Sequence, residues 1–226
     1  MIRKAISVFC LFYGILTMAQ VGGESTYQFL NLVSSPRQSA LGGKIFTNVD
    51  YYVTQPLFNP ATINVDIDNQ LALNYTSYLG GISYGSAAYA YTLDRRTQTF
   101  HGGFTYINYG SFDGYDEDGN NTGTFTGSEA ALSLGYALQI GYSDFYFGAN
   151  VKLITSKLEQ YASFGLATDL GLLYVDEDLD FNATLVIRNL GTQITTYAGE
   201  QEPLPFEVGL ACRKLYSMFL FVGTLH

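Results

Sequence analysis

The sequence is poor in charge and in cysteine, and it has no tryptophan. Charged residues make up 14% of its 226 residues, against about 25% in a typical soluble domain, so there is too little charge to cover an ordinary wet surface. Its 20 acidic residues outnumber its 11 basic residues, which argues against a nucleic-acid partner because such binding needs basic patches. Cys10 lies in the leader described below, so Cys212 has no partner for an internal disulfide.

Beyond its first twenty residues the chain also lacks a long uncharged apolar run. Residues 1–19 show the three parts of a secretory signal peptide, with a positive start at Arg3 and Lys4, a short apolar run, and small residues before Gln20. This apolar run is shorter than the ~20 residues that a spanning helix needs. We therefore expect cleavage near Gln20, and any later membrane span has to be built from strands.

Residues 20–68 differ from the rest of the chain, because they lack sustained alternation and contain three of the five prolines. Ser35 followed by Pro36 is typical of a helix start, and the Gly42-Gly43 pair is typical of a helix end. The pattern predicts a short helix over Arg37–Leu41 within irregular structure that packs inside something larger.

From Asn69 onward, apolar side chains alternate with small or polar ones, as in Leu132, Leu134, Tyr136 and Leu138. Alternate residues of a strand point to opposite faces of a sheet. One face is therefore apolar throughout, and the other face is polar with mid-strand charges at Lys152, Asp169, Arg188 and Glu207. We expect about eight strands, near residues 69–79, 83–93, 99–109, 128–140, 143–157, 162–175, 180–190 and 204–215.

The lengths of these strands favour an all-β, antiparallel transmembrane barrel over residues 69–226. Several are longer than the usual ~5–6 residues of globular sheets and reach the ~9–11 that a membrane-crossing strand needs. Connections at 80–82, 141–142 and 176–179 are short, whereas those at 110–127 and 191–203 are long, which suits periplasmic turns and external loops. A soluble β-sandwich is the alternative.

Two candidate catalytic residues have simpler interpretations. Ser83 lies in a Gly-x-Ser-x-Gly pattern, but the residues after it alternate as a strand, whereas a nucleophile elbow needs a helix there. His101 stands alone beside Gly102 and Gly103, with no orienting partner that the sequence identifies. We expect a hairpin turn at Ser83 and no catalytic role for either residue.

A calcium-like loop also fails on inspection. Asp116, Asp118 and Asn120 have the spacing of the first three ligands of an EF-hand, but Asn121 and Gly127 occupy the positions that need Gly and Glu. A solvated acidic turn is the better interpretation, and a looser divalent site stays open. The sequence thus predicts no cofactor, no metal site and no enzyme activity.

Three N-terminal stretches, residues 27–32, 35–43 and 57–62, resemble the signature of a FadL-like outer-membrane group of Bacteroidota. In that group a Pro-Arg-x-x-Ala-hydrophobic-Gly-Gly segment precedes an Asn-Pro-Ala element and then a barrel. The matching residues here, which we expect to be structural, are Pro36, Arg37, Gly42, Gly43, Asn59 and Pro60.

Later stretches are similar to the PorQ family of the type IX secretion system, and the resemblance covers nearly all of residues 22–209. They are residues 94–96, 105–110, 112–116, 157–161, 188–193 and 204–208. The resemblance implies a fourteen-strand barrel with the N-terminal segment in its lumen. It also implies membership of an outer-membrane attachment complex with PorU and PorV, as a docking base for a peripheral PorZ-like protein, with no catalytic residues.

The end of the chain departs from that family. Members run longer, and residues 210–226 lose the family pattern and lack a terminal strand that ends in an aromatic residue. About eight strands stand where the family has fourteen. We therefore expect this chain to be a C-terminally truncated barrel, with closure as a smaller barrel as the alternative.

The leading hypothesis is a non-enzymatic outer-membrane component of type IX secretion that anchors a surface partner through its long loops. The candidate contact residues are Phe112, Asp113, Tyr115, Asp116 and Tyr197. A FadL-like transporter of hydrophobic compounds is the second hypothesis, although it needs an apolar path where the inward positions are small or polar. A soluble secreted binding sandwich is the third.

Overall fold

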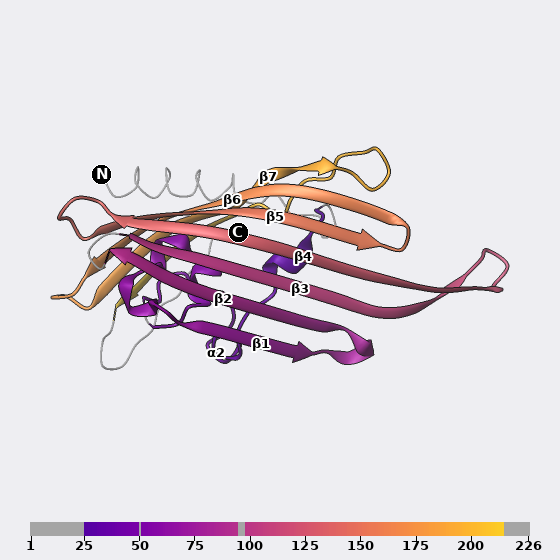
Figure 1. The fold of residues 1–226 in the computed structure, drawn as a ribbon, viewed down its shortest axis with the longest axis horizontal. Coiled ribbons are helices and arrows are strands. Elements are labelled where there is room, and N and C mark those ends of the chain that lie inside the picture. The colour runs from indigo at the N-terminus through magenta and orange to yellow at the C-terminus, as the bar shows by residue number, and fades with distance from the viewer. Residues whose placement is uncertain (1–24, 50, 95–97, 215–226) are drawn as a thin grey trace, which may run out of the picture.

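The computed structural model describes residues 25–49, 51–94 and 98–214, and its strands form a single antiparallel sheet (Figure 1). The strands pair in sequence order, β1 to β8. Their bounds are β1 Leu71–Ser77, β2 Ser83–Asp94, β3 Gln98–Tyr115, β4 Asn121–Gln139, β5 Phe145–Leu158, β6 Tyr161–Asp176, β7 Phe181–Thr195 and β8 Glu207–Lys214. The predicted all-β class and the eight antiparallel strands are confirmed for the described residues.

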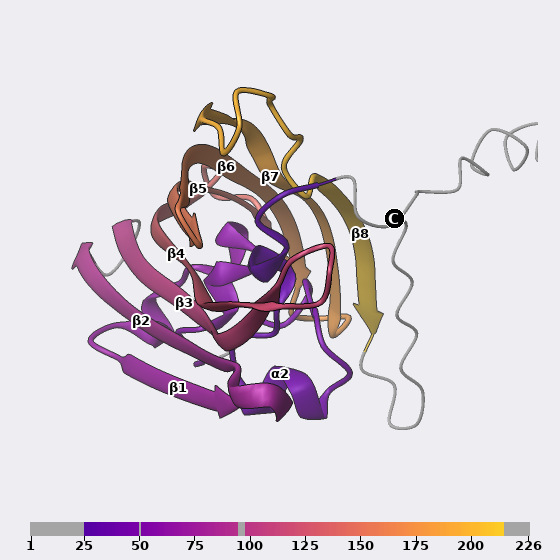
Figure 2. The same ribbon diagram turned by 90° about the vertical axis from the view of Figure 1, so that its right-hand side faces the viewer.

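The sheet bends into an arc around residues 25–49 and 51–68 (Figure 2). Among the described strands, β1 pairs only with β2 and β8 pairs only with β7, so the sheet is not closed. A sandwich needs two sheets, whereas the described strands form a single sheet. No helix within the described residues has the length and apolar character of a membrane span.

The outer face of the arc is apolar and the inner face is polar. In β4, Leu132, Leu134 and Leu138 are 42%, 60% and 38% exposed, whereas Ser133 and Ala137 between them are buried. The same alternation runs through the neighbouring strands, whose exposed residues include Leu73, Tyr75, Tyr89, Tyr91, Phe104, Phe147, Val151, Leu153, Leu166, Leu172, Leu185, Val208 and Leu210. The expected two-faced strands are confirmed, and the apolar stripe of β4 is not sealed in a core.

The long loop expected at 110–127 is wrong, because both flanking strands continue into it. β3 extends to Tyr115 and β4 begins at Asn121, so the hairpin turn is short. Phe112 lies opposite Phe125 across the two strands, and their rings stack with centroids 5.4 Å apart. Such cross-strand aromatic pairs stabilise a two-stranded ribbon, and β-branched threonines around Phe125 favour the extended backbone.

The other predicted loop also starts too early. β7 continues to Thr195, so the connection to β8 covers residues 196–206 instead of 191–203. A shift in register between Thr168 and Leu170, where β6 pairs with β7, interrupts the simple alternation there. Because the bulge adds a residue to β7 before Leu190, the alternation in the sequence breaks there, and the strand was predicted to end at residue 190.

Residues 25–68, here called the N-terminal segment, lie against the inner face of the sheet (Figure 2). The segment contains short helices: η1 Gln28–Asn31, α2 Pro36–Ala40, η2 Gln55–Leu57, η3 Pro60–Thr62 and η4 Val65–Ile67. In α2 the Ser35 side chain accepts a hydrogen bond from the Gln38 amide at 3.2 Å, as an N-cap should. Gly42 and Gly43 follow with φ of +96° and +109°, so the predicted helix and its glycine exit are confirmed.

The buried core lies between this segment and the sheet. The segment contributes large side chains, including Phe29, Phe46 and Phe58, and the inner face meets them mostly with small ones. The inner-face residues of the two apolar clusters are Tyr84, Ala88, Ala90, Ile107, Ala131, Ala137, Ile154, Ala167, Val186 and Ala211. Large side chains of the segment thus pack against small side chains of the sheet, so the segment and the sheet form one packed unit.

Candidate functional site

The Asn-Pro-Ala element of the N-terminal segment sits at the centre of the inner face. Asn59 is fully buried, and its Nδ2 donates to the Phe46 carbonyl at 2.7 Å and to Thr184 Oγ1 at 3.0 Å. Its Oδ1 accepts a hydrogen bond from the Ala61 amide at 3.0 Å, which caps η3. A single side chain thus connects the segment to itself and to β7.

Two glycines make room for this element. Gly148 of β5 and Gly171 of β6 lie opposite each other. A Cβ on Gly148 would lie 2.2 Å from the carbonyl carbon of Pro60, and one on Gly171 would lie 2.3 Å from Asn59 Oδ1. The sheet backbone is therefore bare where the turn presses on it, which gives Asn59 and Pro60 structural roles.

The remaining signature residues form α2 and its exit. Pro36 occupies the first turn of the helix, where its missing amide costs nothing. The guanidinium of Arg37 lies over the Tyr52 ring, 3.8 Å from its centroid, a favourable cation–π geometry. These contacts hold the helix against a neighbouring part of the N-terminal segment.

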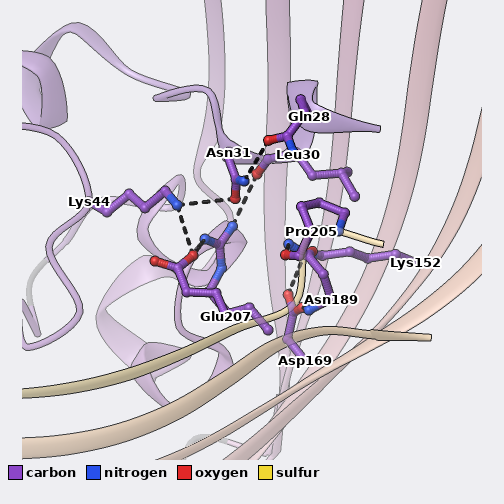
Figure 3. A network of polar contacts seen from close by, with 10 residues as sticks. Gln28, Leu30, Asn31, Lys44, Lys152, Asp169, Asn189, Pro205 and Glu207 are labelled. Carbon is purple, nitrogen blue, oxygen red and sulfur yellow. Dashed lines mark hydrogen bonds and ion pairs between the residues drawn. The ribbon is translucent and has the colours of Figure 1, made fainter. Parts of the chain in front are cut away.

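The four mid-strand charges predicted to face inward are all buried on the inner face, where they form ion pairs. Lys152 Nζ lies 2.6 Å from Asp169 Oδ2, and it donates to Asn189 Oδ1 at 2.9 Å. Asp169 Oδ1 in turn accepts from the Asn189 amide at 2.8 Å (Figure 3). Three neighbouring strands thus contribute one residue each to this pair and its bridge.

The second ion pair reaches into the N-terminal segment. Arg188 and Glu207 lie opposite each other on β7 and β8, with Nη1 and Oε2 2.6 Å apart. Lys44 approaches the same Oε2 at 2.8 Å and also donates to Asn31 Oδ1 at 3.1 Å (Figure 3). Burial and the nearby Arg188 lower the pKa of Lys44, and Glu207 partly offsets both effects.

Arg188 is also held on its other sides. Its Nη2 donates to the Leu30 carbonyl at 3.1 Å, and its guanidinium lies 4.7 Å from the centroid of the Phe58 ring. Through Nη1, Nη2 and the face of its guanidinium, Arg188 attaches the sheet to the N-terminal segment.

Ser83 and His101 occupy structural positions. Ser83 begins β2 two residues after the end of η5 (Leu79–Gly81) and pairs with Ser77 of β1, so the hairpin interpretation is confirmed and a strand follows it. His101 is buried on the inner face, with Nε2 2.8 Å from the Val53 carbonyl. The partner that the sequence did not identify is thus a backbone oxygen of the N-terminal segment.

The acidic turn at the tip of the β3–β4 hairpin uses its own carboxylate. Asp116 Oδ1 accepts from the Asp118 and Asn120 amides at 3.0 and 2.7 Å, and Oδ2 accepts from Asn120 Nδ2 at 3.0 Å. These hydrogen bonds, first that from the Asn120 side chain, lower the pKa of Asp116. Within the described ranges no three His, Cys, Asp or Glu side chains gather in a way that suits a metal ion.

A cavity of about 480 Å³ opens at the hairpin end of the inner face. It lies between the start of the N-terminal segment, the β3–β4 and β5–β6 hairpins and the β7–β8 loop. Of the five predicted contact residues, Phe112 and Tyr197 line this cavity, whereas Asp113, Tyr115 and Asp116 lie on the exposed part of the hairpin. The structure therefore brings Phe112 and Tyr197 together in the cavity and places the other three residues outside it.

One residue in this cavity was missed by sequence reasoning. Glu129 is 5% exposed on the inner face of β4, and its Oε2 accepts a hydrogen bond from the Tyr109 hydroxyl. The signal was present, since Glu129 shares the inward parity of Ser133 and Ala137. Burial raises the pKa of the Tyr27 and Tyr197 hydroxyls that also line the cavity, so both stay neutral at physiological pH.

Comparison with protein-family models, with curated proteins and with solved structures finds no match to this chain.

Proposed function

We propose that this chain is an outer-membrane β-barrel protein without enzyme activity, whose N-terminal segment occupies the lumen and whose hairpin end anchors a surface partner. The observation that carries the proposal is the polarity of the sheet, which exposes leucine and tyrosine outside and buries ion pairs inside. Moving a leucine-sized side chain out of water is worth about 1.5–3 kcal/mol. In water, the protein would lose this stabilisation at every apolar side chain of the outer face. Acyl chains would supply it.

Strand length supports the same proposal. β2 to β7 run from 12 to 19 residues, and about 9–11 residues are enough to cross a bilayer. The charges of the inner face suit a lumen, where they are paired, and would be costly against lipid. Long strands, an apolar exterior and a polar interior together are typical of outer-membrane barrels.

Anchoring is favoured over transport by the filled inner face. The N-terminal segment packs Phe46, Phe58 and Ile67 against the sheet, and Lys44 and Asn59 attach it by polar contacts. A FadL-like transporter of hydrophobic compounds needs an apolar path, and this segment with its buried ion pairs obstructs one. The β3–β4 hairpin, with its exposed Tyr115, extends beyond the packed part and offers a contact surface.

The resemblance to the PorQ family suggests which assembly the partner belongs to. We propose the attachment complex of a type IX secretion system, with a PorZ-like peripheral protein docked on the hairpin end beside PorU and PorV. Two observations support this proposal: the similar sequence stretches occur in the family's order, and the signature residues Asn59 and Pro60 pack against Gly148 and Gly171 of the sheet.

Cell fractionation tests membrane location first. We expect the protein to sediment with outer membranes, to resist carbonate extraction and to enter the detergent phase. Recovery in the aqueous phase would remove the barrel proposal. Crosslinking in intact cells, followed by affinity purification from solubilised outer membranes, tests the partner. Enrichment of the attachment-complex proteins is expected, and their absence from a membrane-located sample would leave a barrel with another task.

A further inference from the structure

The cavity at the hairpin end has aromatic walls contributed by several separate segments. The rings that line it are Tyr27, Tyr109, Phe112, Phe125, Tyr161 and Tyr197. Phe112 and Phe125 stack on each other with an interplanar angle of 25°, so this wall is presented as one surface. A volume of about 480 Å³ falls within the ~300–1,000 Å³ of small-ligand pockets.

Glu129 in this cavity differs from the other buried carboxylates of the inner face. Asp169 and Glu207 each have a lysine or arginine nitrogen 2.6 Å away. Among the ion pairs of the described residues, none includes Glu129, which accepts a hydrogen bond from the neutral Tyr109 hydroxyl and has the neutral Ser156 hydroxyl beside it. Buried charges in proteins are normally paired, so this carboxylate is missing the partner that its two counterparts possess.

The composition of the lining decides the charge of a ligand. Glu129 and Glu159 line the cavity, and no lysine, arginine or histidine is among the residues that do. Aromatic faces attract cations, and cages of such rings recognise substituted ammonium groups. A carboxylate inside a cage strengthens that preference and repels anions, including the carboxylate of a fatty acid.

We propose that this cavity binds an organic cation, an ammonium or guanidinium head on a short apolar stem, with Glu129 as its counter-ion and the surrounding rings as its walls. Two sources supply this chemistry: a free small molecule, or a lysine or arginine side chain of the surface partner. Only the second source rests on the proposed anchoring function. The site itself depends on the geometry of this chain.

Binding is measured by calorimetry on the purified full chain in detergent micelles, with choline as the probe and 3,3-dimethylbutan-1-ol as its neutral carbon isostere. We expect choline to bind at least tenfold more tightly than the alcohol. The Glu129→Gln variant keeps the size of the side chain and removes its charge. It should lose that preference while its weak affinity for the alcohol stays the same.

The matched control is Glu117→Gln, which removes one negative charge from the exposed tip of the same hairpin without touching the cavity. It should change choline affinity less than twofold. Equal binding of choline and the alcohol by the unmodified protein, or unchanged choline binding in Glu129→Gln, would overturn the proposal. If Glu129→Gln does not fold, Tyr161→Leu takes its place and should weaken choline about threefold or more, with no loss contradicting the cage.

A second arm separates the two sources. A short neutral peptide carrying one lysine is compared with the same peptide carrying norleucine. Lysine-selective binding that Glu129→Gln abolishes supports a partner side chain, whereas choline binding without peptide binding supports a free cation. Failure of both probes sinks the site, while fractionation of the same protein to the outer membrane would leave the anchoring proposal intact.

Discussion

The two faces of a single strand carry opposite kinds of side chain. In β5, Val151 and Leu153 are exposed on the outer face, and Lys152 between them is buried in an ion pair with Asp169. A soluble protein arranges these side chains the other way round. The comparison teaches that the inner face is organised by charge pairing and close fit, and that the outer face is organised by what surrounds it.

The largest expected effect comes from breaking an inner ion pair. Arg188→Leu removes one of the cations beside Glu207 and the hydrogen bond to the Leu30 carbonyl. Removing one partner of a buried pair typically costs about 3–5 kcal/mol. Urea unfolding of the protein in detergent or lipid should show a loss of this size.

The companion variant tests whether pairing itself matters. Lys152→Met combined with Asp169→Leu removes both charges of the other pair, and such replacements are often neutral or stabilising. Lys152→Met alone leaves Asp169 as a buried charge without its lysine. Because such a charge is costly, we expect the double variant to be more stable than this single variant by about 2 kcal/mol or more. A double variant as unstable as the single one would contradict the view that the inner face is organised by charge pairing.

The next effect addresses the outer face. Leu134 is 60% exposed near the middle of the sheet, and an arginine at the centre of a lipid-facing strand costs about 2–4 kcal/mol. Leu134→Arg should therefore destabilise the protein by that amount in bilayers. The same change on a wet surface would have almost no effect, so a neutral result in vesicles would place this face in water.

A smaller effect is expected where the Asn-Pro-Ala turn meets the sheet. Gly148→Ala places a methyl group against the backbone of Pro60, and overpacking of this kind costs about 1–3 kcal/mol. Gly102→Ala is the matched control, because its nearest contact would be the Tyr89 carbonyl oxygen at 4.0 Å. Equal stability of the two variants in urea titrations would show that Pro60 is not closely packed against Gly148.

The smallest effect is a local change with pH at the hairpin tip. Because the pKa of Asp116 is lowered in the folded turn, its hydrogen bonds stabilise the turn above the unfolded pKa. That contribution is lost as the pH falls through the folded value. The amide resonances of Asp118 and Asn120 should therefore shift together in acid, and Asp116→Ala should remove the transition.

Much of the sheet could be predicted from the sequence because strand periodicity is a local property. The alternation around Leu132 and the inward placement of Lys152 follow from the pleat alone. The continuation of β3 and β4 to the hairpin tip could not, since it depends on Phe112 meeting Phe125 across the strands. Residues that stabilise a ribbon in this way look like loop residues when each is considered alone.

The candidate sites were predictable only in part, for a related physical reason. The inward charges could be assigned to a face, but the contact between Lys44 and Glu207 joins residues 163 positions apart. The cavity brings Phe112 and Tyr197 together with Tyr27 from the N-terminal segment, and no local pattern foretells that meeting. Glu129 was readable as an inward charge, yet its lack of a cation is visible only once the pairs of Asp169 and Glu207 are seen.

The bare backbone at Gly148 and Gly171 has a consequence for the order of assembly. Asn59 must contact Thr184, 125 residues later in the chain, and contacts of such long sequence separation form slowly. Because the turn fits this closely against two neighbouring strands, the packing of those strands is complete only when the turn is in place. We therefore expect the N-terminal segment to act as a template on which the later strands assemble.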